Sequence, residues 1–251
     1  MIKPMLAKKY NNQDVTGWLM SEKLDGVRCI YDGEKFYSRN GKIFHAPDWF
    51  YTTLPKGVVL DGELYQGLGQ FQKTCGIVRR YNDNWDNVKF MVFDLVNDNM
   101  TFESRIEYLK YMINDLAGHF QLVPHQVCNG VSSLARYEKK LRGYGAEGVM
   151  IKNPKSMYQY KRSSDLLKLK QFINDECKLV DFQDGQGKHT DKVGALICEW
   201  KGHTIKLGTG ITDRLRENPP KIGAFLTFSY FELTDKGVPR FPAFVEVRDY
   251  E

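Results

Sequence analysis

Short apolar runs dominate the first two thirds of the chain, and they predict β-strands. Two longer segments between these runs have helical periodicity instead. Residues 105–116 place Ile106, Leu109, Met112, Ile113 and Leu116 on one face of a helix. Residues 132–145 begin with two serines that can cap a helix, and they end at glycines. The runs that predict strands are VRCIYDG, VVLDGELY, VKFMVFDLV, GVMIK and DLLKLK.

After Asp175 the pattern changes to strands alone. Five short runs separated by turn residues predict a small β-barrel of the OB-fold type. The chain is therefore expected to be an α+β protein with two domains, residues 1–174 with antiparallel sheets flanked by helices, and residues 175–251 as the barrel. No Pro- or Gly-rich linker marks the boundary, so the joint is expected to be short. The five runs are CKLVDF, GALICEW, HTIKLG, AFLTFSYFEL and FVEVRDY.

Composition excludes several classes of protein. The chain has 251 residues, 42% of them hydrophobic and 27% charged, which is typical of a globular protein. No run of eighteen apolar residues exists, so neither a membrane span nor a membrane partner is expected. The first residues do not read as a signal peptide, which predicts a cytoplasmic location, or a periplasmic one if a leader has been removed. Five scattered cysteines and five histidines show no disulfide or zinc pattern.

Positive charge is concentrated in the first part of the chain. Residues 1–174 carry 25 Lys and Arg against 18 Asp and Glu, whereas residues 175–251 carry 11 against 13. A basic surface attracts polyanions, so nucleic acid or a phosphorylated ligand is favoured over an acidic partner.

The segment SEKLDGVR, residues 21–28, contains residue types that phosphate chemistry needs. An amine attacks only in its neutral form, which burial or neighbouring cations favour, so Lys23 is a candidate nucleophile. Gly26 allows a tight turn, and the guanidinium of Arg28 offers a rigid fork of donors to phosphate oxygens. Taken alone, the segment is better explained as a turn with a solvated salt bridge.

Five further segments follow it in order: SRNG, DGEL, FDL, EGVMIK and LLKLK. With KLDGVR they resemble motifs I, Ia, III, IIIa, IV and V of the ATP-dependent DNA ligases, which belong to the covalent nucleotidyltransferase superfamily. The resemblance covers nearly the whole chain, and its strength lies in six motifs in one order. The β-rich tail resembles the OB domain of these enzymes. Because the first motif begins at residue 23, the chain resembles the minimal ligases of bacteria and viruses, without an upstream DNA-binding domain.

The resemblance implies a role for each motif residue. Lys23 would carry the covalent AMP, Arg39 would grip the 5′-phosphate of the nick, and Phe93 would stack on adenine. Glu63 would contact the ribose, and it would bind a divalent metal together with Glu147. The implied residues are Lys23, Lys168 and Lys170 for catalysis; Glu22, Arg28, Glu63, Phe93, Glu147, Lys168 and Lys170 for the nucleotide; Arg39, Lys152 and Arg162 for DNA; and Glu63 and Glu147 for the metal.

Strand periodicity supports part of this site independently. Lys168 and Lys170 share one face of a strand, and the leucines between them share the other. Two ammonium groups beside a leucine-lined core suit a phosphate-binding cleft, although an amphipathic edge strand would alternate in the same way. Asp61 and Glu63 also share a face, which Mg²⁺ could use.

Three other features have competing explanations. The segment KSMYQYKR, residues 155–162, could contact DNA by stacking and phosphate pairing or form a solvated loop, and DNA contact is slightly favoured. The segment GQGKHT lacks phosphate-loop spacing and is interpreted as a turn between barrel strands. The four tryptophans are interpreted as packing residues.

The C-terminal sequence VRDYE departs from the family's motif VI, which reads RxDK. The lysine is missing and the spacing is compressed. Arg248 and Asp249 are the candidates for the role of this motif, which orients the pyrophosphate in the first step.

The predicted function is the sealing of nicks in double-stranded DNA by a monomer that uses ATP and Mg²⁺, with Mn²⁺ as a possible substitute. The alternatives are an RNA ligase, an mRNA-capping-type nucleotidyltransferase or, from a different class, a non-catalytic OB-type nucleic-acid-binding protein. KLDGVR together with SRNG favours a DNA ligase.

Overall fold

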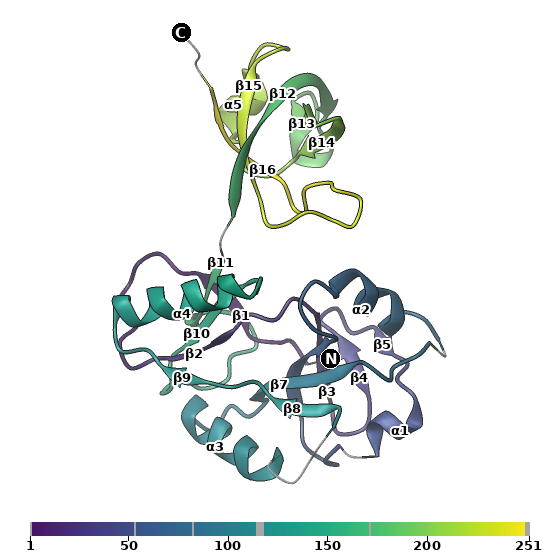
Figure 1. The fold of residues 1–251 in the computed structure, drawn as a ribbon, viewed down its shortest axis with the longest axis vertical. Helices are drawn as coiled ribbons and strands as arrows, with labels where there is room; N and C mark the ends of the chain where they lie inside the picture. The colour runs from purple at the N-terminus through teal and green to yellow at the C-terminus, as the bar shows by residue number, and fades with distance from the viewer. Residues whose placement is uncertain (1, 53, 82, 114–117, 171, 249–251) are drawn as a thin grey trace. The chain divides into compact units, whose positions relative to one another are not determined.

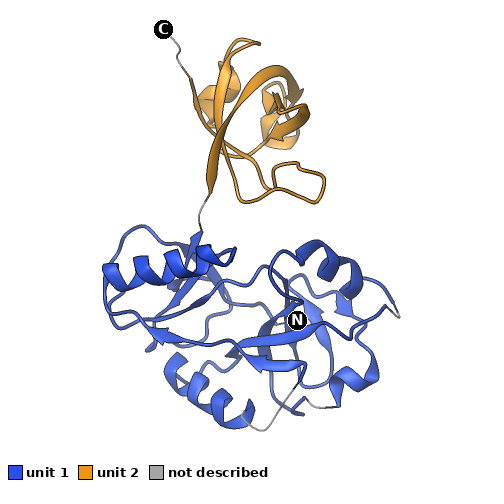
Figure 2. Ribbon diagram, in the orientation of Figure 1, with its two compact units in different colours: residues 1–170 blue, residues 171–251 orange. Residues whose placement is uncertain are grey.

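The computed structural model describes residues 2–52, 54–81, 83–113, 118–170 and 172–248. The chain forms two compact units, residues 1–170 and residues 171–251 (Figure 2). The boundary expected from the sequence, between residues 174 and 175, falls inside a strand that already starts at Ile173. None of the helices in these ranges is long and apolar enough to cross a membrane.

One sheet of the first unit has the strand order β1-β11-β10-β2-β9 (Figure 1). Strands β1 and β11 run parallel, whereas the other neighbours are antiparallel. The expectation of a purely antiparallel sheet is therefore wrong for this sheet. The strands are β1 (Leu6–Lys9), β2 (Leu19–Glu22), β9 (Gln126–Val127), β10 (Gly148–Lys152) and β11 (Arg162–Lys170).

The second sheet of this unit has the order β5-β4-β3-β6-β7-β8. Among the described strands of this sheet, β7 and β8 run parallel and the other neighbours are antiparallel. The strands are β3 (Val27–Tyr31), β4 (Phe36–Ser38), β5 (Ile43–Phe44), β6 (Leu60–Tyr65), β7 (Lys89–Leu95) and β8 (Phe120–Leu122).

Four helices accompany these sheets: α1 (Asp48–Tyr51), α2 (Phe71–Val78), α3 (Phe102–Ile113) and α4 (Val131–Gly143). The predicted face of α3 is confirmed, because Ile106, Leu109 and Ile113 are buried in the core beside β7 and β8; Leu116 lies outside the described residues. The predicted serine caps of α4 are wrong. Its N-cap is Gly130, which has a φ of 94° and makes no side-chain capping bond.

The core of each sheet follows from strand alternation. In β10, Val149 and Ile151 are fully buried in the core beside α4, whereas Met150 and Lys152 face the opposite side of the sheet. The second sheet buries a larger aromatic core, in which Phe36, Phe50 and Phe90 pack edge to face. Each sheet thus buries one face in its core, and its opposite, more polar face remains for a site.

The second unit is a five-stranded antiparallel sheet of order β14-β13-β12-β15-β16. Thr209, two residues after β14, forms an isolated bridge with Ala243 of β16, but no ladder joins the two outer strands among the described residues, so the expected barrel is open. The segment GQGKHT forms the predicted turn between strands, and this turn includes a short 3-10 helix that was not predicted. The elements are β12 (Ile173–Asp184), η1 (Gly187–His189), β13 (Val193–Trp200), β14 (His203–Leu207), α5 (Asp213–Glu217), β15 (Phe225–Tyr230) and β16 (Ala243–Val247).

Candidate nucleotide-binding site

A pocket of about 240 Å³ lies in the first unit and is lined by residues from both sheets. It receives side chains from β2, β10 and β11 of one sheet and from β3, β6 and β7 of the other. Predicted site residues that line it are Glu22, Lys23, Arg28, Arg39, Glu63, Phe93, Lys152, Arg162 and Lys168. Segments that lie up to about 150 residues apart in the chain thus meet at one cavity.

Lys23 lies directly after β2, where its backbone N–H donates to the carbonyl of Gly148, 2.9 Å away. Its ammonium group contacts Glu147, and Glu147 is also paired with Lys170. We call these three residues the Glu147 cluster. The two lysines keep about a fifth of their side-chain surface exposed, 22% and 21%, whereas the carboxylate is 4% exposed.

Two glycines allow the strands around Lys23 to approach closely. A Cβ on Gly26 would lie 2.5 Å from the carbonyl oxygen of Leu64 and 2.7 Å from Cγ of Glu63. A Cβ on Gly148 would collide with the carbonyl oxygen of Leu169 in the neighbouring strand. The glycines of KLDG and EGV therefore serve close backbone packing that brings the lysine and the carboxylates together.

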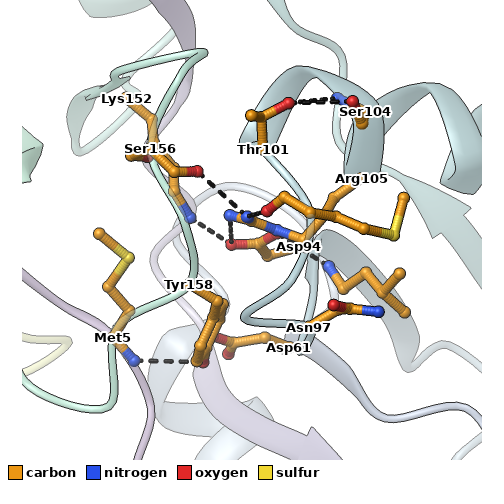
Figure 3. A network of polar contacts seen from close by, with 12 residues as sticks. Met5, Asp61, Asp94, Asn97, Thr101, Ser104, Arg105, Lys152, Ser156 and Tyr158 are labelled. Atoms are coloured by element: carbon orange, nitrogen blue, oxygen red, sulfur yellow. Dashed lines mark hydrogen bonds and ion pairs between the residues drawn. The ribbon is translucent and has the colours of Figure 1, made fainter.

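Arg28 makes a bidentate contact with Asp61, with Nε–Oδ1 and Nη2–Oδ2 distances of 2.9 and 2.5 Å. The hydroxyl of Tyr158 also donates to Asp61 at 2.7 Å and accepts from the backbone of Met5 (Figure 3). The guanidinium of Arg28 lies 5.2 Å from the ring centre of Phe93. Asp61 is thus occupied by protein donors and is not available to a metal, contrary to the expectation for the DGE face.

Glu63 is the carboxylate whose protonation is most affected by the pocket. Burial, with the negative charges of Glu147 and Asp61, raises its pKa to about 8, although Lys23 and Arg28 oppose the shift. A bound cation would favour the ionised form.

The donor set fits Mg²⁺ with a nucleotide better than Mg²⁺ alone. Among the described residues no group of three or more Asp, Glu, His or Cys side chains could hold a metal. Mg²⁺ is commonly held by one or two carboxylates, with phosphate oxygens and water completing the shell. Glu63 and Glu147 supply two hard oxygen donors of this kind.

Lys168 brings further positive charge to the pocket. Burial lowers its pKa, and the charges of Lys170, Lys23 and Arg162 lower it further. Leu167 is fully buried on the other face of β11, so the predicted alternation of lysines and leucines is confirmed. Lys168 and the three cations that lower its pKa form a group of positive charge that suits a triphosphate.

Lys152 does not lie where a DNA contact would need it. Its side chain is 8% exposed and pairs with Asp94, which also binds the fully buried Arg105 through Nε–Oδ1 and Nη2–Oδ2 distances of 2.7 and 3.2 Å (Figure 3). We call Arg105, Asp94 and Lys152 the Asp94 cluster. The interpretation of Lys152 as a DNA contact is corrected, because its ammonium group is enclosed in the pocket wall.

The exposed cations of the pocket are Arg39 and Arg162, and Arg162 donates to the backbone of Ala7. Glu22 is half-buried, which raises its pKa.

In KSMYQYKR, Tyr158 is a core residue rather than a stacking surface, because it is 2% exposed and bonded to Asp61. Trp85 and Trp200 are buried packing residues as predicted, whereas Trp49 is 42% exposed.

Arg248 lies in the second unit, where its Nε is 2.9 Å from Glu176. Asp249, the other candidate for motif VI, lies outside the described residues.

The residues to which the sequence assigned no role include His125 and Met150, which line the pocket, and Asp94 and Arg105, which form a cluster with the lining residue Lys152. Met150 shares the face of β10 with Lys152, so strand alternation alone could have identified it. Arg105 belongs to the predicted helix but is not one of the apolar residues that define its buried face. It carried no signal, because its partner Asp94 is defined only by the tertiary fold.

Comparisons with known proteins agree with this arrangement. The family model described as an ATP dependent DNA ligase domain matches residues 4–170, and a DNA ligase OB-like domain matches residues 184–248. A DNA ligase of Haemophilus influenzae is 32% identical over 242 residues, which are 96% of this chain and 90% of the relative.

Solved structures give the same result. One from a structure-function study of Lig E DNA ligases, concerned with DNA binding by a minimal scaffold, has a TM-score of 0.92 and 34% identity, covering 99% of this chain and 100% of that one. The Chlorella virus DNA ligase-adenylate has a TM-score of 0.59 and 26% identity, covering 100% of this chain and 99% of that one.

Proposed function

The chain belongs to the ATP-dependent DNA ligase family, and on this premise we propose that it seals nicks in duplex DNA as a monomer with ATP as co-substrate. The first unit would transfer AMP, and the second would add DNA contacts. Lys23 lines a pocket rich in cations and contacts Glu147, and this contact is the observation that carries the proposal.

In the first step the neutral amine of Lys23 attacks the α-phosphorus of ATP. A P–N bond forms, the P–O bond to pyrophosphate breaks, and the amine loses its proton. The carboxylate of Glu147 touches this amine and is placed to accept the proton. Lys168 and Lys170 offset the negative charge that develops on the leaving pyrophosphate.

Glu63 and Glu147 are the residues that would hold Mg²⁺, or Mn²⁺ by the same oxygen chemistry. The bound metal would neutralise charge on the phosphates. Phe93 presents an aromatic ring at the pocket wall for the adenine, and Glu22, Arg28 and Glu63 lie around it for the rest of the nucleotide.

The second and third steps use the DNA. AMP passes from Lys23 to the 5′-phosphate of the nick, forming a P–O bond as the P–N bond breaks. The 3′-hydroxyl then attacks that phosphate and AMP leaves. The exposed Arg39 and Arg162 are the pocket cations best placed to reach a DNA phosphate. Arg248 and Asp249 remain the proposed counterpart of motif VI.

A nick-sealing assay tests the proposal. The full chain is incubated with nicked duplexes of DNA or RNA, with Mg²⁺, and with ATP or GTP. We expect a sealed product only with nicked DNA and ATP. Sealing of RNA would favour an RNA ligase, an enzyme–GMP adduct without sealing would favour a capping-type enzyme, and DNA binding without any adduct would favour a non-catalytic protein.

A further inference from the structure

The hydroxyl group of Tyr158 joins three segments that are distant in the sequence. It donates to Oδ2 of Asp61 on β6 at 2.7 Å, and it accepts from the backbone N–H of Met5, just before β1, at 3.1 Å (Figure 3). The ring is 2% exposed, and its centre lies 5.7 and 5.6 Å from the charged groups of Arg105 and Lys152. Because Met5 already donates to the hydroxyl oxygen, the hydrogen of the hydroxyl is left for Asp61. The fold therefore fixes the direction of this hydrogen bond.

Asp61 passes this constraint on to Arg28. The terminal torsion of an aspartate is broad, so a carboxylate can rotate unless several donors hold its plane. Here Oδ1 accepts from Nε of Arg28 at 2.9 Å, and Oδ2 accepts from Nη2 at 2.5 Å as well as from the hydroxyl of Tyr158. Three hydrogen bonds thus define the plane of a carboxylate that is 1% exposed. The planar guanidinium pairs with both oxygens and takes its orientation from that plane.

The orientation of Arg28 decides where its remaining donors point. A guanidinium carries five N–H donors in a rigid fork, and Asp61 takes one on Nε and one on Nη2. Nη1 has no hydrogen-bond partner among the described residues, and the side chain, which lines the nucleotide pocket, is 21% exposed. The ring of Phe93, another residue of the pocket wall, lies 5.2 Å from the guanidinium. The donors left on Arg28 are thus available to a ligand in the pocket.

We propose that Tyr158 is a positioning residue for the nucleotide, because its hydroxyl holds the Asp61 carboxylate in the plane that aims the free N–H groups of Arg28 into the pocket. This rests on the proposed function, in which Arg28 binds the nucleotide. Tyr158 acts through Asp61 and Arg28 rather than by contact with the nucleotide. The substitution Tyr158→Phe fills the same space but leaves the carboxylate freer to turn. The guanidinium then samples several orientations, and fewer of them offer donors to the nucleotide.

The experiment measures how fast the full chain forms its AMP adduct as the concentration of α-labelled ATP is varied, with Mg²⁺ present. Each chain reacts once, so the slope of the rate constant against ATP at low concentration reports alignment, and the final stoichiometry reports the fraction of folded chains. We expect Tyr158→Phe to lower the slope roughly ten- to hundredfold, the loss of one hydrogen bond to a charged group. The stoichiometry should not change. A role in folding alone would lower the stoichiometry and leave the slope unchanged.

Further variants make the result specific to Arg28. In an Arg28→Lys background, Tyr158→Phe should change the slope by less than about twofold, because an ammonium group is a point charge with rotatable donors and has no plane to orient. Replacement of Tyr158 by 4-aminophenylalanine keeps a donor at the para position and should restore most of the slope. Tyr31→Phe is the matched control, since Tyr31 lies on the same strand as Arg28, is 2% exposed and donates to the carbonyl of Gly33 at 2.9 Å. Its slope should equal that of the unmodified protein.

The outcomes separate the two proposals. An unchanged slope in folded Tyr158→Phe, or an equal fall in the Arg28→Lys background, would overturn the role of Tyr158 while leaving the proposed function intact. If Arg28→Lys forms no adduct or Tyr158→Phe does not fold, the 4-aminophenylalanine variant decides. It should keep the slope within about threefold of the unmodified protein, and a larger fall at full stoichiometry would overturn the role. An unmodified protein that forms no adduct with ATP would overturn the proposed function and this inference with it.

Discussion

The Glu147 cluster and the Asp94 cluster have the same composition in different surroundings. In each, one buried carboxylate is shared by two cations. The lysines of the Glu147 cluster remain 22% and 21% exposed, whereas the cations of the Asp94 cluster are 0% and 8% exposed. Cations with access to water can exchange a carboxylate for a phosphate at little cost, whereas enclosed ones cannot. The first arrangement suits chemistry, and the second fixes β7, β10 and α3 around it.

The largest effect is expected at the reactive lysine. Lys23→Ala should abolish the AMP adduct and all sealing from ATP, with no change in thermal unfolding. Lys23→Arg should fail as well, because a guanidinium does not lose its proton near neutral pH. Adduct formation is measured with α-labelled ATP on denatured protein. An adduct that survives in either variant would assign the nucleophile to another residue.

Replacing each shared carboxylate by its amide tests the comparison directly. Asp94→Asn leaves two cations enclosed without a counter-charge and should lower the free energy of unfolding by about 3–5 kcal/mol. Glu147→Gln leaves cations that water can reach and should cost about 1 kcal/mol or less, while it abolishes the adduct. Urea denaturation measures the free energy of unfolding of the two variants. Equal losses of stability would mean that the difference in exposure has no energetic consequence.

The pH dependence of stability probes the enclosed end of the pocket. Because His125 has a pKa near 4 when folded and about 6.5 when unfolded, protons bind the unfolded chain preferentially. The contribution of this group is complete above about pH 6.5 and is lost as the pH falls toward 4, by at most about 3 kcal/mol. His125→Gln should therefore show a shallower decline over this range in urea unfolding. Parallel curves for the two proteins would contradict the burial of the ring.

The smallest expected effect is at the stacking surface. Phe93→Ala should raise the ATP concentration needed for half-maximal adduct formation, since one stacking contact of roughly 1–3 kcal/mol is removed. Phe93→Tyr should need nearly the same ATP concentration as the unmodified protein, because it keeps an aromatic ring. If the Ala and Tyr variants have the same ATP dependence, the ring of Phe93 only packs against Arg28.

The sequence predicted the long strands and the face of α3 because each buries a periodic set of side chains. The short elements β5, β9 and α1 span two to four residues, which is too few to show a period. Gly130 at the start of α4 replaced the predicted serine caps, since a positive φ at that position favours glycine.

Motif residues were found because six short motifs occur along the chain in the order in which a known family carries them. The partners of these residues were not. Lys152 was interpreted as a DNA contact because its sequence neighbours carry no information about Asp94, which lies 58 positions away. For the segment KSMYQYKR, DNA contact was slightly favoured over a solvated loop, because the hydrogen bond that holds Tyr158 in the core joins it to Asp61, 97 positions away. Burial and pairing of charges arise from the tertiary fold, which local pattern does not encode.

The most direct test of the account is to locate the covalent AMP. The full chain is incubated with ATP and Mg²⁺, digested under conditions that preserve a P–N bond, and its peptides are sequenced by mass spectrometry. The account predicts one adenylylated residue, Lys23, in the peptide that carries KLDGVR, and no modification of Lys152, Lys168 or Lys170. AMP on any of those three lysines, or no adduct at all, would contradict it.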